Sequence, residues 1–162
     1  WEDYYQELVG TEQLLDINDR QFFHDNIMLQ ARIHLEGCRG LKFLCDSYFA
    51  YQKEDLVRAF VGVFNGKLMF GEAQKSLQEA QHGKWENFYR GDWLTNIKST
   101  VRFCDSLQQY LRVVGDVALI TWFKEYLEPE SERGVGLAYI NRNPIPDDVL
   151  ALKLSHLFKE FE

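Results

Sequence analysis

The chain has 162 residues, of which 46% are apolar and 15% aromatic, and its formal net charge is −7. This length suits one domain with a buried core, and the aromatic content excludes a disordered chain. Eleven glycines, three prolines and three cysteines exclude collagen-like and disulfide-scaffold proteins. No apolar run reaches the roughly 18 residues that a membrane-spanning helix requires.

The negative charge is concentrated near the N-terminus. Residues 1–25 contain seven acidic side chains against Arg20 alone, a net charge of −6. The other 137 residues carry 18 acids and 17 bases, a net charge of −1. Because the chain has no basic stripe, we expect neither a nucleic-acid partner nor an anionic membrane surface.

The first of three long helical patterns begins at Asn18, which with Gln21 forms an N-terminal capping signal. Apolar residues then recur at three- and four-residue steps as far as Tyr51, which predicts one helix with a wide apolar face. Gly37 and Gly40 interrupt this pattern and indicate either a kink or the close approach of another helix. The predicted face comprises Phe23, Ile27, Met28, Ala31, Leu35, Cys38, Leu41, Leu44, Cys45, Tyr48 and Tyr51.

The second pattern starts near Lys53 and stops at Gly83, and the short turn around Gln52 predicts that it runs antiparallel to the first. Gly62 and Gly66 have the Gly-x-x-x-Gly spacing, which predicts close backbone packing between helices. The apolar positions of this helix are Leu56, Ala59, Phe60, Val63, Phe70, Ala73, Leu77 and Ala80.

The third helical pattern begins at Leu94, and we expect Gly115 to end this helix. Asp92 or Thr95 can cap its N-terminus. Three antiparallel helices need a further element to close their core. We therefore predict an all-α, up-and-down antiparallel bundle in a single domain, 1–162, with the core bundle over 18–115 and an extension over 116–162. The candidate closing helices are Trp1–Leu8, Val117–Leu127 and Asp147–Phe161, and residues 134–140 are short and β-tolerant enough for an extended segment.

The segment Gly83–Trp93 is unusually rich in aromatic residues. Flat rings interleaved with carboxylates, an amide and a guanidinium are the groups that stack on sugar rings and bind paired hydroxyls. The alternative is structural, with the loop folding its rings onto the bundle. The candidate ligand-binding residues are Trp85, Tyr89, Arg90, Asp92 and Trp93.

Other chemistry has weaker signals. Glu79 and His82 match one Glu-x-x-His motif of di-iron bundles, but the second copy that such a site needs is missing. The three cysteines, Cys38, Cys45 and Cys104, fall within apolar helical patterns and are predicted to be buried free thiols. Nucleophile elbows and phosphate-binding Gly-rich loops do not occur, so we predict no catalytic residue and no cofactor.

Together with Asp25-Asn26-Ile27, the segment Gly83–Trp93 resembles helical segments that follow the catalytic barrel in bacterial glycoside hydrolases, such as the family 115 xylan α-glucuronidases. The resemblance covers about residues 18–115. In such enzymes the catalytic carboxylates belong to the barrel, so the resemblance implies no catalytic role for this chain. It also implies a periplasmic or extracellular location.

The sequence therefore favours a non-catalytic helical accessory or interaction module whose partner is a neighbouring domain of the same polypeptide. The initial Trp1, with Tyr4 and Tyr5, also suggests a segment of a longer protein. The alternatives are a carbohydrate-binding module that uses the aromatic loop 85–93 and a helical-bundle metal-binding enzyme.

Overall fold

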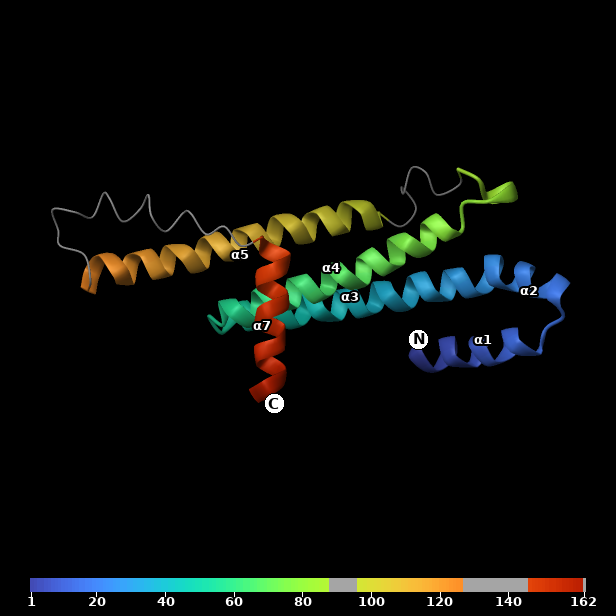
Figure 1. Cartoon of the computed structure of the whole chain (residues 1–162), viewed down its shortest axis with the longest axis horizontal. Coiled ribbons are helices and arrows are strands. Elements are labelled where there is room, and N and C mark those ends of the chain that lie inside the picture. Colours follow the sequence, from blue (N-terminus) through green and yellow to red (C-terminus); the bar gives the residue numbers. More distant parts are fainter. Residues whose placement is uncertain (88–95, 127–145, 162) are drawn as a thin grey trace. The chain divides into compact units, whose positions relative to one another are not determined.

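The computed structural model describes residues 1–87, 96–126 and 146–161, and every regular element in those ranges is helical (Figure 1). The all-α prediction with three long helices is confirmed, whereas the expected extended segment at 134–140 lies outside the described residues. In chain order the elements are α1 (Glu2–Leu14), α2 (Ile17–Phe23), the π-turn η1 (His24–Met28), α3 (Leu29–Gln52), α4 (Leu56–Glu79), the 3-10 turn η2 (Gly83–Trp85), α5 (Ile97–Tyr126) and α7 (Asp147–Phe161).

The chain divides into two compact units. Unit 1 consists of Trp1–Leu44 and Asn65–Cys104, and unit 2 consists of Cys45–Phe64 and Asp105–Glu162. Each of the long helices α3, α4 and α5 contributes one part to each unit. The single domain expected from the sequence stays a prediction.

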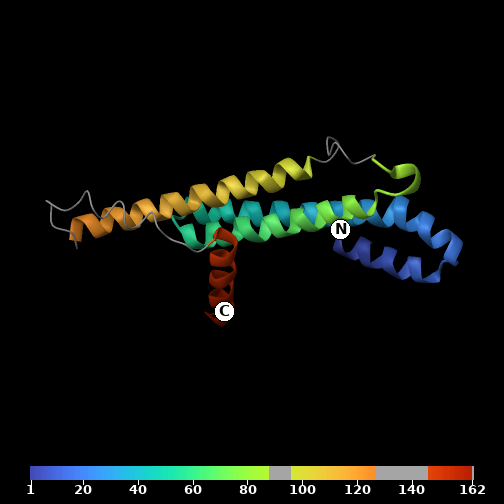
Figure 2. The ribbon, with the colours of Figure 1, turned by 45° about the horizontal axis from the view of Figure 1, so that its top comes forward.

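Helices α3 and α4 lie side by side and antiparallel (Figure 2). In unit 1, Arg32 of α3 pairs with Glu79 near the end of α4, at 3.1 Å. In unit 2, the Ser47 hydroxyl donates a hydrogen bond to the carbonyl of Ala59, near the start of α4, at 2.7 Å. The connection between the helices is a tight turn over 53–55 in which Glu54 has a positive φ of 61°. Because the turn is so short, the second helix must run antiparallel to the first.

Helix α4 packs through the apolar face that its sequence predicts. One row of its buried positions recurs at alternating steps of three and four residues, the spacing that places side chains along one seam between helices. The small members of this seam allow α3 to approach closely. The row consists of Ala59, Val63, Gly66, Phe70, Ala73, Leu77 and Ala80, and Phe60, Val61, Phe64 and Ser76 are buried beside it.

The predicted face of α3 is partly wrong. Its members Met28, Ala31 and Leu35 are buried and Leu44 is half-buried against Gly66, but most of the later members are exposed, because α4 packs on a different stripe of the helix. Gly40 and Ser47, seven residues apart, contact α4. The predicted core residues that are exposed instead are Ile27, Cys38, Leu41, Cys45, Tyr48 and Tyr51. Of the three cysteines, Cys104 alone is buried as predicted.

Two glycines set the distance between α3 and α4 in unit 1. A Cβ atom added at Gly40 would lie 2.7 Å from the tip of the Phe70 ring, and one added at Gly66 would lie 3.1 Å from the Gly40 carbonyl oxygen. Helix α3 runs through Gly37 and Gly40 without a break. Gly40 and Gly66 are therefore sites of close helix approach, as the sequence predicted for the Gly-x-x-x-Gly segment.

Several helices begin or end at residues other than those that the sequence predicts. Asp16, not Asn18, occupies the N-cap position of α2. Helix α4 begins at Leu56, where the Asp55 carboxylate accepts the Arg58 backbone N–H at 3.0 Å. Helix α5 does not end at Gly115 but continues to Tyr126. A glycine ends a helix by adopting a positive φ, whereas Gly115 keeps helical backbone angles. The predicted helix Asp147–Phe161 is confirmed as α7.

We predict that Gly40→Ala destabilises the protein relative to Gly37→Ala, three residues earlier on the same helix. Both changes gain helix propensity, up to about 1 kcal/mol. Gly37 has no atom within 4 Å of an added Cβ, whereas at Gly40 the buried Phe70 ring must move, at a cost of about 1–3 kcal/mol. Urea denaturation of the two variants measures the difference. Equal stabilities would contradict close packing at Gly40.

Candidate functional site

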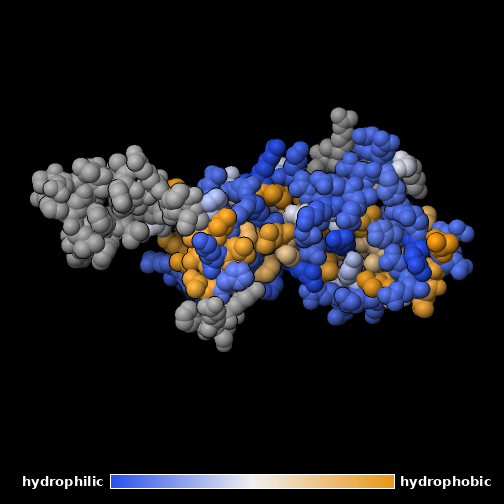
Figure 3. Space-filling view, viewed as in Figure 1, coloured by the Kyte–Doolittle hydropathy of each residue, from blue (hydrophilic) through white to orange (hydrophobic). Residues whose placement is uncertain are grey.

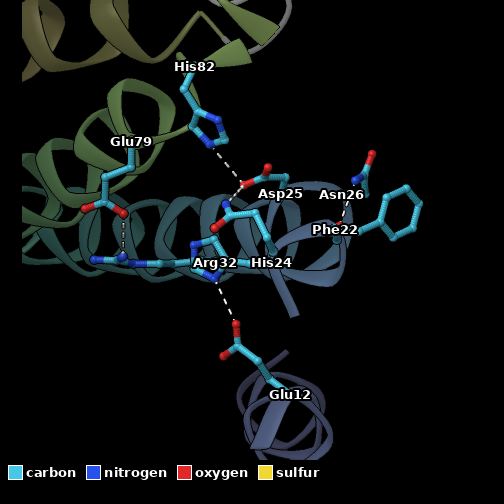
Figure 4. Close-up of polar contacts among 9 residues, drawn as sticks. Glu12, Phe22, His24, Asp25, Asn26, Arg32, Glu79 and His82 are labelled. Atoms are coloured by element: carbon cyan, nitrogen blue, oxygen red, sulfur yellow. Dashed lines mark hydrogen bonds and ion pairs between the residues drawn. The ribbon is translucent and has the colours of Figure 1, made fainter. Parts of the chain in front are cut away.

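A π-turn joins α2 to α3 and presents polar side chains to the rest of unit 1. The Leu29 backbone N–H donates to the His24 carbonyl, five residues earlier, which is the π-helical pattern. Within this wider turn the Asn26 side-chain amide donates to the Phe22 carbonyl at 2.7 Å (Figure 4). Single π-turns within helices occur frequently at functional sites, and this one carries His24 and Asp25.

Two residues of the π-turn bind side chains from distant parts of unit 1 (Figure 4). His24 Nδ1 lies 3.0 Å from Glu12 Oε1 on α1. Asp25 Oδ1 lies 3.1 Å from Nε2 of His82, just after α4, and also accepts a hydrogen bond from Gln21 Nε2 at 2.9 Å. With Glu79, which pairs with Arg32, we call these side chains the polar cluster: Glu12, Gln21, His24, Asp25, Arg32, Glu79 and His82.

The polar cluster borders a surface hollow of about 450 Å³. The Arg20 guanidinium, at its edge, donates to the Leu15 carbonyl at 3.2 Å. The carboxylates of Glu12, Asp25 and Glu79 each have a protein partner, so the cluster cross-links α1, the π-turn, α3 and the end of α4. The exposed ion pair between Arg32 and Glu79 contributes about 0–1 kcal/mol. The hollow is lined by Glu12, Ile17, Arg20, Gln21, His24, Glu79 and His82.

The acidic N-terminal segment folds onto basic groups of the same unit. Besides the His24 and His82 contacts, Glu2 Oε1 lies 3.1 Å from Arg39 Nε on α3. Trp1 stacks on the His34 ring, with centroids 5.1 Å apart and planes at 18°. The excess negative charge over residues 1–25 is therefore partly neutralised within unit 1.

Of the predicted sugar-binding residues, the structure describes Trp85, which is half-buried in η2. Tyr89, Arg90, Asp92 and Trp93 lie outside the described residues. The hydrogen bond between Asp25 and His82 joins the first of the two segments on which the glycoside hydrolase resemblance depends to the residue that directly precedes the second. Nothing in the sequence alone indicated this contact, because 57 residues separate the two side chains.

The Glu-x-x-His motif has protein partners. Glu79 binds Arg32, and His82 binds Asp25. Within residues 1–87, 96–126 and 146–161, no three His, Cys, Asp or Glu side chains gather as a metal site would require. The same part of the chain contains no helix with the length and apolarity of a membrane span.

Unit 2 exposes a group of aromatic side chains, and two of them, Tyr48 and Tyr51, have the helical spacing that predicts a core position. Tyr48 is 57% exposed, Phe49 58%, Tyr51 39% and Tyr110 51%. The Tyr48 and Phe49 rings lie 6.0 Å apart, and the Tyr51 and Tyr110 hydroxyls are 3.3 Å apart. We call these four residues the aromatic patch. The sequence could not reveal it, since a tyrosine at helical spacing suits either a core or an interface.

A second apolar surface of unit 2 lies beside α7. A groove of about 230 Å³ is lined mainly by aliphatic side chains, and Arg112 at its edge pairs with Asp147, the first residue of α7. Figure 3 shows apolar side chains gathered around α7 and the adjacent ends of α3 and α4. The groove residues are Leu56, Val57, Phe60, Leu111, Arg112, Gly115, Leu150 and Leu154.

Comparison with known proteins gives no relative: no family model, curated protein or solved structure matches the chain. Its function must therefore be inferred from its own residues.

We predict that Asp25→Ala destabilises the protein by about 1–2 kcal/mol, because Gln21 and His82 both lose their acceptor. The matched control is Glu7→Ala, which removes one carboxylate from an exposed position of α1. Urea denaturation measures both variants. A cluster without a structural role would leave the two variants equally stable.

Proposed function

We propose that this chain is a non-catalytic helical interaction module that packs against a neighbouring domain of a larger, carbohydrate-active bacterial protein. The aromatic patch of unit 2 carries the proposal. Four neighbouring aromatic side chains, each more than a third exposed, form a surface that water solvates poorly. Tyrosine and other aromatic residues are enriched at protein interfaces, where they contribute much of the binding energy.

The polar cluster of unit 1 joins segments of the chain to one another. The His24 imidazole faces Glu12 on α1, and the His82 imidazole faces Asp25 of the π-turn. The non-catalytic part of the proposal depends on the resemblance, in which the catalytic carboxylates belong to the barrel.

The carbohydrate-active part of the proposal depends on the resemblance of Gly83–Trp93 and Asp25–Ile27 to helical segments of xylan α-glucuronidases. It predicts that the partner domain belongs to the same polypeptide. The neighbouring domain then supplies the catalytic carboxylates, and this chain supplies a surface for packing.

We predict that the aromatic patch is protected in the protein encoded by the complete reading frame. Hydroxyl-radical footprinting with mass spectrometry would compare this chain alone with the complete protein. Tyr48 and Phe49 should be modified several-fold more slowly in the complete protein, because a docked domain excludes solvent from them.

Tyr4 and Phe22, exposed aromatic residues of unit 1, provide the internal reference, and their rates should not change. Equal modification rates of Tyr48 and Phe49 in the two proteins contradict the proposal. A complete reading frame that encodes this chain and no further domain contradicts it as well. Protection without a carbohydrate-active domain in the complete protein supports the interaction module and contradicts the carbohydrate link.

The second candidate function is carbohydrate binding by unit 1. The hollow beside the polar cluster favours it, because carboxylate, amide, guanidinium and imidazole groups line it. His82 at its edge directly precedes the turn that carries Trp85. A sugar would hydrogen-bond to the polar lining and stack on the ring of Trp85.

We predict, for this second function, that the chain binds xylan-derived oligosaccharides on a glycan array and that Trp85→Ala abolishes the binding without lowering the melting temperature. Phe103→Ala, at an exposed position of α5, is the matched control and should bind normally. If Trp85 is structural, Trp85→Ala lowers the melting temperature instead, and the wild-type chain retains no sugar.

A further inference from the structure

Tyr51 on α3 and Tyr110 on α5 form a contact pair in unit 2. Their hydroxyl oxygens are 3.3 Å apart, and their ring centroids are 6.5 Å apart with planes inclined at 53°. Both side chains are exposed, and 59 residues separate them along the chain. The pair combines proximity with access from solvent.

We propose that Tyr51 and Tyr110 are a site of oxidative modification, at which a one-electron oxidant joins the two rings as an intramolecular dityrosine. This inference does not depend on the proposed function and concerns the chain with its aromatic patch uncovered, because a domain docked on the patch would exclude the oxidant. Its product is a covalent tether between α3 and α5.

The reaction balances with hydrogen peroxide as the oxidant and a haem peroxidase as the catalyst. Each phenol loses one electron and its hydroxyl proton and becomes a phenoxyl radical. The two radicals form a carbon–carbon bond between ring carbons ortho to the oxygens, and each ring then transfers its ortho hydrogen to its oxygen as a proton. The protein loses two hydrogen atoms in total, and one hydrogen peroxide becomes two water molecules.

Proximity favours this pair over coupling between separate molecules. Two groups held in contact react as if each were at very high concentration, provided that the reacting atoms can meet. The ortho carbons are bonded to the carbons that carry the hydroxyls, so the contact between the hydroxyls brings them near one another. Both side chains are exposed, so their rings can rotate until the two ortho carbons face one another.

The hydrogen bond between the hydroxyls keeps Tyr51 in its phenol form. It raises the pKa of Tyr51 above its ordinary value of 10.0, because an ionised Tyr51 could no longer donate to Tyr110. The electron therefore leaves a neutral phenol, and the hydroxyl proton passes to solvent, to which both side chains are exposed.

Other tyrosines have different neighbours. Tyr4 contacts the edge of Trp1, with ring centroids 5.7 Å apart, and Tyr48 contacts Phe49. The Tyr48 hydroxyl accepts a hydrogen bond from Gln52 Nε2 at 2.8 Å. Tyr48 is thus as exposed as the pair and lies on the same helix, but its ring contact is with a phenylalanine. It provides the matched control.

The experiment treats the dilute chain with peroxidase and hydrogen peroxide, after Cys38 and Cys45, which are exposed thiols, have been alkylated. We expect a monomeric product that is lighter by two hydrogen atoms and shows dityrosine fluorescence. Peptide mapping should identify a link between the peptides that contain Tyr51 and Tyr110. The urea midpoint of this product should rise, because the tether restricts the unfolded chain.

Tyr51→Phe and Tyr110→Phe should each abolish the monomeric product, whereas Tyr48→Phe should form it at the wild-type rate. Circular dichroism confirms that the variants are folded. A monomeric product linked through other tyrosines, or dityrosine found in dimers alone, overturns the proposal. The wild-type peptide map decides the question even if a variant is unstable.

Discussion

The close contact between α3 and α4 in unit 1 is the constraint on which the position of the polar cluster depends. Gly40 and Gly66 leave room for the Phe70 ring and for the facing backbone. Because the helices approach this closely, Arg32 on α3 reaches Glu79 on α4. The same antiparallel register brings the end of α4, and with it His82, to the π-turn that precedes α3.

The two units have different surface chemistry. In unit 1, Glu2 pairs with Arg39, and the carboxylates of Glu12 and Asp25 contact the rings of His24 and His82, so the acidic segment is partly compensated within the unit. Both units expose aromatic side chains, among them Trp1, Tyr4 and Phe22 in unit 1. The hollow of unit 1 is lined mainly by polar and charged side chains, whereas the groove beside α7 in unit 2 is lined mainly by aliphatic ones. Apolar surface gains free energy when a partner covers it, and the groove is therefore a second reason to propose the interface in unit 2.

The helices themselves could be predicted with good accuracy from apolar periodicity. Helix α4 packs on the predicted residues, since its seam consists of apolar side chains such as Phe70 and Leu77. The face of α3 could not be predicted in the same way. Its contacts with α4 include Gly40 and Ser47, and small or polar residues carry no apolar signal. The exposed Tyr48 and Tyr51 were consequently mistaken for core.

The sequence by itself determined that the chain is helical and that α3 and α4 run antiparallel, because helical periodicity and a short turn are local properties. It also indicated that one pair of helices approaches closely at a glycine. The tertiary structure alone decided which stripe of α3 is buried, where the π-turn places His24 and Asp25, and which tyrosines meet. Those outcomes depend on contacts between residues such as Asp25 and His82, or Tyr51 and Tyr110, that lie nearly 60 positions apart, and no local pattern encodes such a pairing.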